Sequence, residues 1–311
     1  MGEVPALPYR DFPMPAIIAA QARGWLDTDP ADRKIAVPRP SSTVMLLREG
    51  ADGEAASTGG RQAVEVFVLR RVSSMPFAPG MVAFPGGGVD ARDADPGVPW
   101  AGPTPTQWAH LLGTDVAHAR VLVIAAAREV FEECGVLLAG PDTDHVVADL
   151  TGPSWSPDRA ALLDRSQSFG EMLTRLGLVL RTDLLALRAH WVTPECEPRR
   201  YDTRFFAARM PRGQTADGST SEAERVAWAT PTAILAAQAQ GREILLPPTQ
   251  VMLEQLSRLD DVEDLDAWLA TPVVVHRVMP VPAEHSGQLW MRSPIGADGH
   301  GRSTGTSAAS D

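Results

Sequence analysis

Hydrophobic and polar residues follow two different periods along the chain, and these periods predict strands and helices in alternation. Short runs rich in Val, Leu and Phe predict strands, which we place at 42–48, 64–71, 81–84, 187–192, 203–209, 225–229 and 273–279. Apolar residues spaced three or four apart predict helices, which we place at 17–23, 115–134, 157–176, 231–240, 248–259 and 262–269, with a further helical pattern from 106 onward. Such alternation indicates an α/β sandwich.

Segments that show neither period divide the chain into an extension, a domain and a tail. Residues 1–40 are proline-rich and form the predicted extension, and 41–295 form the predicted domain. Within the domain, the Gly-, Ala- and Ser-rich stretch 49–61 predicts a loop, and 154–185 predicts a helical insertion. The stretch 296–311 is rich in Gly, Ser, Thr and Ala, which predicts a disordered tail.

The charge and cysteine content narrow the possible partners. The formal net charge is −11, which argues against non-specific binding to nucleic acid or to an anionic membrane. No apolar run approaches the ~20 residues of a membrane-spanning helix. The two cysteines, Cys134 and Cys196, form neither a disulfide framework nor a zinc pattern, so we expect a cytoplasmic protein. A small molecule is the expected partner, and a homodimer is compatible with these patterns, which do not determine the oligomeric state.

One predicted helix ends in a cluster of acidic residues. Glu129, Glu132 and Glu133 share one face, because residues three and four apart are neighbours on a helix. The simplest structural reading is a solvated charged face, but three like charges repel one another, whereas a hard divalent cation favours clustered carboxylate oxygens. Gly135 ends the helix as a C-terminal capping glycine does. We therefore expect Mg²⁺ or Mn²⁺ at this face.

The residues around this helix resemble the signature of the Nudix hydrolases. Residues 128–136 follow the spacing Arg-Glu-apolar-x-Glu-Glu-x-Gly-apolar, which resembles the second half of the Nudix box. Residues 84–90, Phe-Pro-Gly-Gly-Gly-Val-Asp, supply the strand, turn and glycines of its first half. Five residues lie between Gly87 and Asp93, which stands where the family has Glu. The intervening segment 94–127 is 34 residues long, far longer than the family's usual spacer, so the box is interrupted by an insertion.

Two further segments resemble one subgroup of that family. A split box is a feature of the subgroup that includes the peroxisomal coenzyme A diphosphatase, and both 66–90 and 191–206 are similar to stretches of its members. The Arg-x-His-x-Gly pattern of some coenzyme A hydrolases is replaced by the different residues at 75–80. The resemblance covers about 40–240 and implies a Nudix-type α/β/α sandwich with a mixed sheet, carrying the helical insertion and C-terminal additions.

The resemblance also implies a reaction, namely metal-dependent hydrolysis of the diphosphate bond in a nucleoside diphosphate derivative. Coenzyme A or an acyl-coenzyme A is the first candidate substrate, which would give 3′,5′-ADP and phosphopantetheine or its acyl form. ADP-ribose, NADH and nucleoside triphosphates are the alternatives. Some Nudix domains bind nucleotides without cleaving them, usually after losing a glutamate of the box, and all three glutamates are present in this chain.

The resemblance assigns the metal to the glutamate helix and the glycine turn. The expected metal ligands are Glu129, Glu132, Glu133 and a backbone carbonyl near Gly87. Arg128 is expected to orient Glu132, which lies within i+4 reach. Asp93 either replaces the first acid of the box or only tethers the turn.

The general base and the substrate contacts are less closely defined by the motif. Glu133, Glu222 and Glu224 compete as general base, and Glu132 and Arg128 complete the expected catalytic set. The substrate-binding residues that we expect are Arg70, Arg199, Arg200 and Phe84. The structural alternative for Arg199 and Arg200 is pairing with neighbouring acids at the surface.

Overall fold

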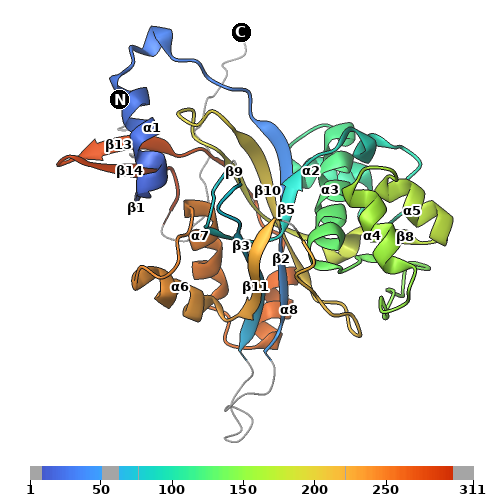
Figure 1. Ribbon diagram of the computed structural model, residues 1–311. Coiled ribbons are helices and arrows are strands. Elements are labelled where there is room, and N and C mark those ends of the chain that lie inside the picture. The colour runs from blue at the N-terminus through green and yellow to red at the C-terminus, as the bar shows by residue number, and fades with distance from the viewer. Residues whose placement is uncertain (1–8, 51–62, 76, 221, 297–311) are drawn as a thin grey trace, which may run out of the picture.

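A central mixed sheet forms the middle layer of the protein. The computed structural model describes residues 9–50, 63–75, 77–220 and 222–296 (Figure 1). The sheet has the strand order β11-β3-β2-β10-β9-β12, with β4 paired to β3 and β5 paired to β2. β2 is parallel to β10 and β9 is parallel to β12, whereas the other pairs are antiparallel. The strands are β2 Arg39–Glu49, β3 Val64–Arg71, β4 Val82–Ala83, β5 Gly86–Gly88, β9 Ala186–Val192, β10 Tyr201–Arg209, β11 Ala223–Ala229 and β12 Arg277–Val278.

Helices cover both faces of the sheet, which confirms the predicted α/β/α sandwich. Figure 1 shows α2 to α5 on one side and α6 and α7 on the other. The described helices are α1 Ala16–Asp27, α2 Pro105–Leu112, α3 Val116–Cys134, α4 Trp155–Leu163, α5 Phe169–Leu176, α6 Pro231–Ala239, α7 Pro247–Leu256 and α8 Val262–Ala270. None of them alone is long and apolar enough to span a membrane; α2 and α3 reach that length only together, across a 92° bend.

Alternation along β2 divides the hydrophobic core in two. Val44 and Leu46 belong to the cluster that contains α3, whereas Met45 and Leu47 belong to the cluster that contains α7 and α8. All four side chains are fully buried. Successive side chains of a strand point to opposite faces, so a strand covered on both sides becomes a continuous apolar run.

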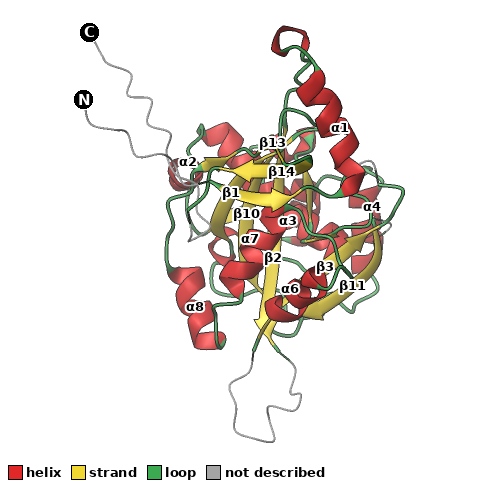
Figure 2. Ribbon diagram, turned by 90° about the vertical axis from the view of Figure 1, so that its left-hand side faces the viewer, coloured by secondary structure: helices red, strands yellow, loops and turns green. Residues whose placement is uncertain are grey.

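Two small sheets flank the sandwich. β6 Trp100–Ala101, β8 Val179–Arg181 and β7 Ala139–Gly140 form a three-stranded sheet beside the predicted insertion. β1 Arg10–Pro13, β14 Gln288–Ser293 and β13 Val281–His285 form the other, with α1 against β14 (Figure 2). Our strand predictions missed these elements. β6, β7 and β8 have two or three residues and are too short to show a period, whereas β1, β13 and β14 have four to six residues and are defined by their pairing with one another.

Two predicted elements differ from the structure. Of the predicted strand 273–279, only Arg277–Val278 pairs with the sheet. The predicted helix 157–176 is two helices, because Arg165 adopts a φ of 66° and Ser168 starts a new capping box with Glu171. The predicted loop 49–61 and the tail 296–311 lie almost entirely outside the described residues.

The segment between the two halves of the signature does not form a separate body. Residues 94–127 contain β6, α2 and the first twelve residues of α3. The α3 helix begins after Asp115, whose carboxylate accepts a hydrogen bond from the His118 amide at 2.8 Å. It ends at Gly135, which has a φ of 66°. Much of the long spacer is therefore an N-terminal elongation of the helix that carries the glutamates.

Candidate active site

Four charged side chains are buried at the C-terminal end of α3. Arg128, Glu129, Glu132 and Glu133 expose only 4–8% of their surface. Burial of charge is costly unless each group is paired and hydrogen-bonded. The structure meets that requirement with groups from the distant glycine turn, which carries β5 and the short 3-10 helix Ala91–Ala94.

Arg128 holds this cluster together through its whole guanidinium fork. Its Nε and Nη2 donate to the two carboxylate oxygens of Asp93 at 2.9 and 3.0 Å. Its Nη1 donates to Glu129 at 2.8 Å and to Glu132 at 3.0 Å, and Nη2 also donates to the Gly88 carbonyl. The expected Arg128–Glu132 pair is thus present, and Asp93 is a direct partner of the arginine. Asp93 also accepts from the Asp90 amide, so it tethers the turn as well.

Glu129 and Glu133 contact the glycine turn, whereas the Glu132 carboxylate is directed at Arg128. The Glu133 carboxylate accepts a hydrogen bond from the Gly86 amide at 2.8 Å. A Cβ on Gly87 would lie 2.6 Å from Glu129 Oε1, so only glycine fits against that carboxylate. Burial raises the pKa of Glu129 to about 8, and burial together with the charge of Glu129 raises the pKa of Glu133.

This donor set suits a hard divalent cation. Two buried carboxylates that repel each other, beside the backbone of a glycine turn, are an oxygen-rich site whose charge a cation would compensate. Within the described ranges, no three Asp, Glu, His or Cys side chains already converge as a closed metal cage. Glu129, Glu133 and the backbone near Gly87 are the groups that would hold Mg²⁺ or Mn²⁺.

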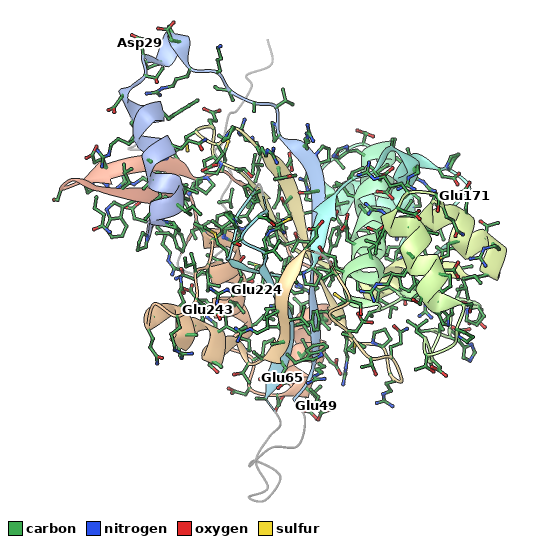
Figure 3. The ribbon with its side chains drawn as sticks, in the orientation of Figure 1. Asp29, Glu49, Glu65, Glu171, Glu224 and Glu243 are labelled. Carbon is green, nitrogen blue, oxygen red and sulfur yellow. The ribbon has the colours of Figure 1, made fainter. Side chains whose placement is uncertain are left out.

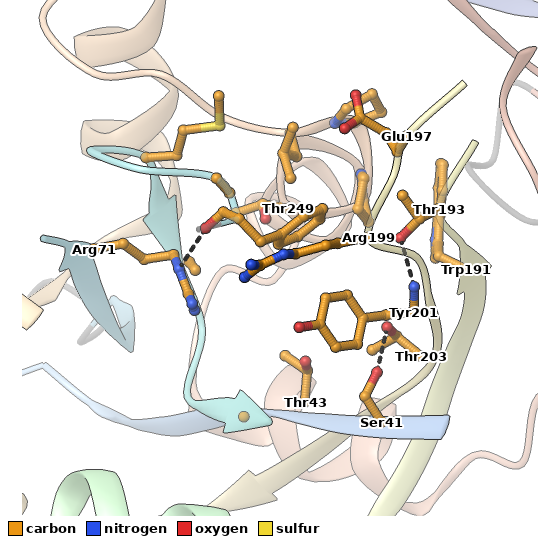
Figure 4. Close-up of a pocket in the computed structure, with 18 of the residues that line it drawn as sticks. Ser41, Thr43, Arg71, Trp191, Thr193, Glu197, Arg199, Tyr201, Thr203 and Thr249 are labelled. Carbon is orange, nitrogen blue, oxygen red and sulfur yellow. Dashed lines mark hydrogen bonds between the residues drawn. The ribbon is translucent and has the colours of Figure 1, made fainter. Parts of the chain in front are cut away.

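A pocket of about 470 Å³ opens on the other side of the same glycine turn. Its lining includes Gly86, Gly87 and Gly88 with Arg71 and Glu222. Figure 4 shows Arg71 and Arg199 extending into the pocket from two sides toward each other. The remainder of the wall is largely apolar and includes Ile17, Ile18, Phe77, Pro247, Pro280 and Met291. The pocket therefore combines cationic side chains and the glycine-turn backbone with a largely apolar wall.

Only some of the residues that we expected to contact the substrate line the pocket. Phe84 and Arg199 line the pocket. Arg200 does not, because its side chain is buried and donates to the backbone carbonyls of Thr193 and Ala36. These bonds fix the loop before β10 to the chain that leads into β2.

Arg70 also does not line the pocket, whereas its neighbour Arg71 does. Arg70 forms ion pairs with Glu224 and Glu243 at 3.8 and 3.5 Å, on a surface that Figure 3 shows with both acids labelled. Arg71 lines the pocket and donates to the Phe77 carbonyl at 3.2 Å. Strand alternation was the available signal, because Arg71 shares its face of β3 with Phe67, which packs in the α3 core.

The two acids at the start of β11 also differ in position: Glu222 directly precedes the strand and Glu224 is its second residue. Glu222 lines the pocket, lies 3.8 Å from Arg71 and contributes to the raised pKa of both Glu129 and Glu133. Glu224 is exposed, forms an ion pair with Arg70 and does not line the pocket. Of the distant acids, Glu222 is the one that faces the glycine turn.

Comparison with known proteins identifies relatives of the whole arrangement. The family model described as the NUDT19 Nudix domain matches residues 103–259. The putative nudix hydrolase 7 of Caenorhabditis elegans is 27% identical over 72% of this chain and 65% of its own length. The acyl-coenzyme A diphosphatase NUDT19 of Gallus gallus is 28% identical over 71% of this chain and 68% of its own length. The matched region thus spans about two thirds of each curated relative.

A solved structure supports the fold independently of those relatives. The crystal structure of a NUDIX hydrolase from Alicyclobacillus acidocaldarius superposes with a TM-score of 0.63. It is 24% identical, and the alignment covers 78% of this chain and all of the other. At this identity the likeness concerns the architecture, and it agrees with the mixed sheet between two helical layers.

Proposed function

The chain belongs to the Nudix hydrolases of the NUDT19 type, and from this premise we propose that it hydrolyses the diphosphate bond of coenzyme A or an acyl-coenzyme A. The products would be 3′,5′-ADP and phosphopantetheine or its acyl form. The observation that carries this proposal is the composition of the pocket, which combines Arg71, Arg199 and the glycine turn with a largely apolar wall. A volume of about 470 Å³ lies in the range that small-molecule sites require.

The two kinds of pocket surface suit different parts of such a substrate. Guanidinium groups bind phosphate oxygens through paired N–H donors, so Arg71 and Arg199 are suited to the diphosphate. The Gly86–Gly88 backbone allows the phosphates to approach closely. The apolar wall that includes Ile17, Ile18 and Met291 is suited to a pantetheine or acyl arm. The alternative substrates ADP-ribose and nucleoside triphosphates lack such an arm.

Each charged residue of the site has a separate role in the proposed reaction. A divalent cation, when bound, neutralises the diphosphate charge and lowers the pKa of a water molecule. Glu129 and Glu133 hold that cation, and Arg128 keeps Glu129 and Glu132 in place. Glu222 faces the pocket from the opposite side, where we assign it to accept the proton of the attacking water. Arg71 lies 3.8 Å from Glu222 and can keep its carboxylate directed into the pocket.

A substrate panel tests this proposal. The protein is incubated with Mg²⁺ or Mn²⁺ and with coenzyme A, an acyl-coenzyme A, ADP-ribose, NADH or a nucleoside triphosphate, and the products are identified by mass. We expect 3′,5′-ADP from the coenzyme A compounds, with the highest kcat/KM for an acyl form. Preferential cleavage of ADP-ribose or a triphosphate would overturn the substrate assignment. Absence of turnover on the whole panel would favour a nucleotide-binding module instead.

A further inference from the structure

The inserted helix α4 packs against the end of the glutamate helix through Trp155, which contacts Phe131, and is hydrogen-bonded to that end through Arg159. Arg159 is 9% exposed, and its Nε donates to the backbone carbonyl of Glu132 at 2.8 Å. Its Nη1 donates to both carboxylate oxygens of Asp217 at 2.7 and 2.9 Å. Arg159 therefore joins three segments that are far apart in the sequence, namely α4, the end of α3 and the loop before β11.

Asp217 completes the connection from the other side. Its amide donates to the Cys134 carbonyl at 2.9 Å, so the loop is bonded to the last residue of α3. A Cβ on Gly135 would lie 3.0 Å from Arg159 Nη1 and 3.0 Å from Asp217 Oδ2, which shows how closely this pair covers the capping glycine. Of the carbonyls that a helix C-terminus leaves unpaired, that of Glu132 is satisfied by the cationic Arg159, which the helix dipole favours, and that of Cys134 by the Asp217 amide.

The same loop leads to Glu222 and is attached again at that point. The Glu222 carbonyl accepts a hydrogen bond from the Val72 amide at 3.0 Å, directly after Arg71. Five positions separate Asp217 from Glu222, so the Asp217 attachment limits where the second acid lies. Arg159 consequently links the position of Glu222 to that of the glutamates on α3.

We propose that Arg159 is a positioning residue, which sets the placement of Glu222 relative to Glu133 by holding the end of α3 and the 211–220 loop together. The proposal rests on the proposed function, because it gives Glu222 a part in the reaction. It also gives the inserted helix a role beyond added packing area. Lysine is a poor substitute, since one ammonium group lacks the fork that reaches a carbonyl and a carboxylate at once.

Kinetics of Arg159→Met test the proposal against a merely structural role. We expect kcat to fall about tenfold or more with KM changed less than about threefold, because the phosphate-binding arginines are untouched. Measurements are made well below the melting temperature, with the folded fraction checked by circular dichroism. A purely structural residue would lower the melting temperature and leave kcat per folded molecule unchanged, which would overturn the proposal.

A double-mutant cycle shows whether the effect passes through Glu222. In the Glu222→Gln background, Arg159→Met is expected to reduce kcat by less than about twofold, since the positioned acid is already lost. Equal losses in both backgrounds would refute positioning of Glu222. If Glu222→Gln alone retains wild-type kcat, the assignment of that residue under the proposed function is wrong, which is a separate failure from an unaffected Arg159→Met.

The chain offers a matched control on the same insertion. Arg175 of α5 pairs with Asp158 of α4 and contacts neither the end of α3 nor the loop before β11 in the bonds that the described residues form. Arg175→Met removes the same type of ion pair and is expected to leave kcat unchanged. Arg159→Lys is expected to recover only part of the lost kcat. Full recovery by lysine would contradict the need for the two-armed contact.

Discussion

The two parts of helix α3, 116–127 and 128–134, both carry buried side chains but are held in opposite ways. Residues 116–127 bring Leu122, Val123, Ile124 and three consecutive alanines into the core, each with no exposed surface. Residues 128–134 bring in an arginine and three glutamates, which expose at most 8%. The first half packs against the sheet, where the Ser42 hydroxyl donates to the Leu122 carbonyl. The second half depends on hydrogen bonds and ion pairs to the glycine turn.

This difference indicates that the first half of the helix contributes mainly to stability and the second half to catalysis. Apolar contacts are non-directional and roughly proportional to buried area, so the first half tolerates small changes of shape. Buried charges require named partners with good geometry, and Arg128 alone joins Asp93, Glu129 and Glu132. We therefore expect changes in the first half to alter stability and changes in the second half to alter activity.

The largest expected effect is on catalysis, from Glu133→Gln. The variant keeps the shape of the side chain but loses a charge that we assign to metal binding, so kcat/KM should fall about 10³–10⁴-fold, or about 4–5.5 kcal/mol. Steady-state kinetics on the preferred coenzyme A compound measure the loss. Glu171→Gln, in the capping box of α5, is the matched control and should behave as wild type. If Glu133→Gln retained wild-type activity, the second half of α3 would not be the part of the helix on which catalysis depends.

Arg128→Met should affect both stability and activity. It leaves Asp93 and two glutamates buried without their shared cation, a situation that costs about 3–5 kcal/mol. Urea unfolding monitored by fluorescence gives the free energy of unfolding, and kinetics on the folded protein give the activity. A variant as stable as wild type would show that the ion pairs contribute nothing to holding this half of the helix.

Leu122→Ala should produce the reverse pattern. Leu122 is fully buried, and its truncation should lower the free energy of unfolding by about 3 kcal/mol through lost burial and a residual cavity. The activity of the folded protein should stay within about twofold of wild type, because the residue lies more than one helical turn from Arg128. A large loss of kcat with normal folding would instead show that catalysis by the second half depends on packing in the first half.

The smallest expected effect is stabilisation by metal. At a Mg²⁺ concentration about 100-fold above its dissociation constant, binding should add about 2.7 kcal/mol to the free energy of unfolding. Thermal unfolding of the wild type with and without Mg²⁺ measures the shift, and Glu129→Gln and Glu133→Gln should reduce it. An equal shift in these variants would place the cation elsewhere.

Local patterns predicted much of the fold. The strand at 64–71 and the helix ending at Cys134 appear as expected, because hydrophobic period and capping residues act within a few positions. The elements that were missed are two or three residues long or, like β14, depend on a partner strand to form. The outcome at Arg70 and Arg71 followed from alternation, which places adjacent residues of a strand on opposite faces.

The sequence by itself determined the grouping of Glu129, Glu132 and Glu133 and the position of their capping glycine, since helical geometry relates residues three and four apart. Only the tertiary structure decided that Asp93 meets Arg128, that Arg71 enters the pocket, and that Arg159 joins α3 to Asp217. These contacts of Arg128 and Arg159 connect residues 27 to 58 positions apart in the chain, and Arg71 lines a pocket formed by several elements. Packing of the layers brings such residues together, and the hydrophobic period along the chain cannot reveal contacts between distant segments.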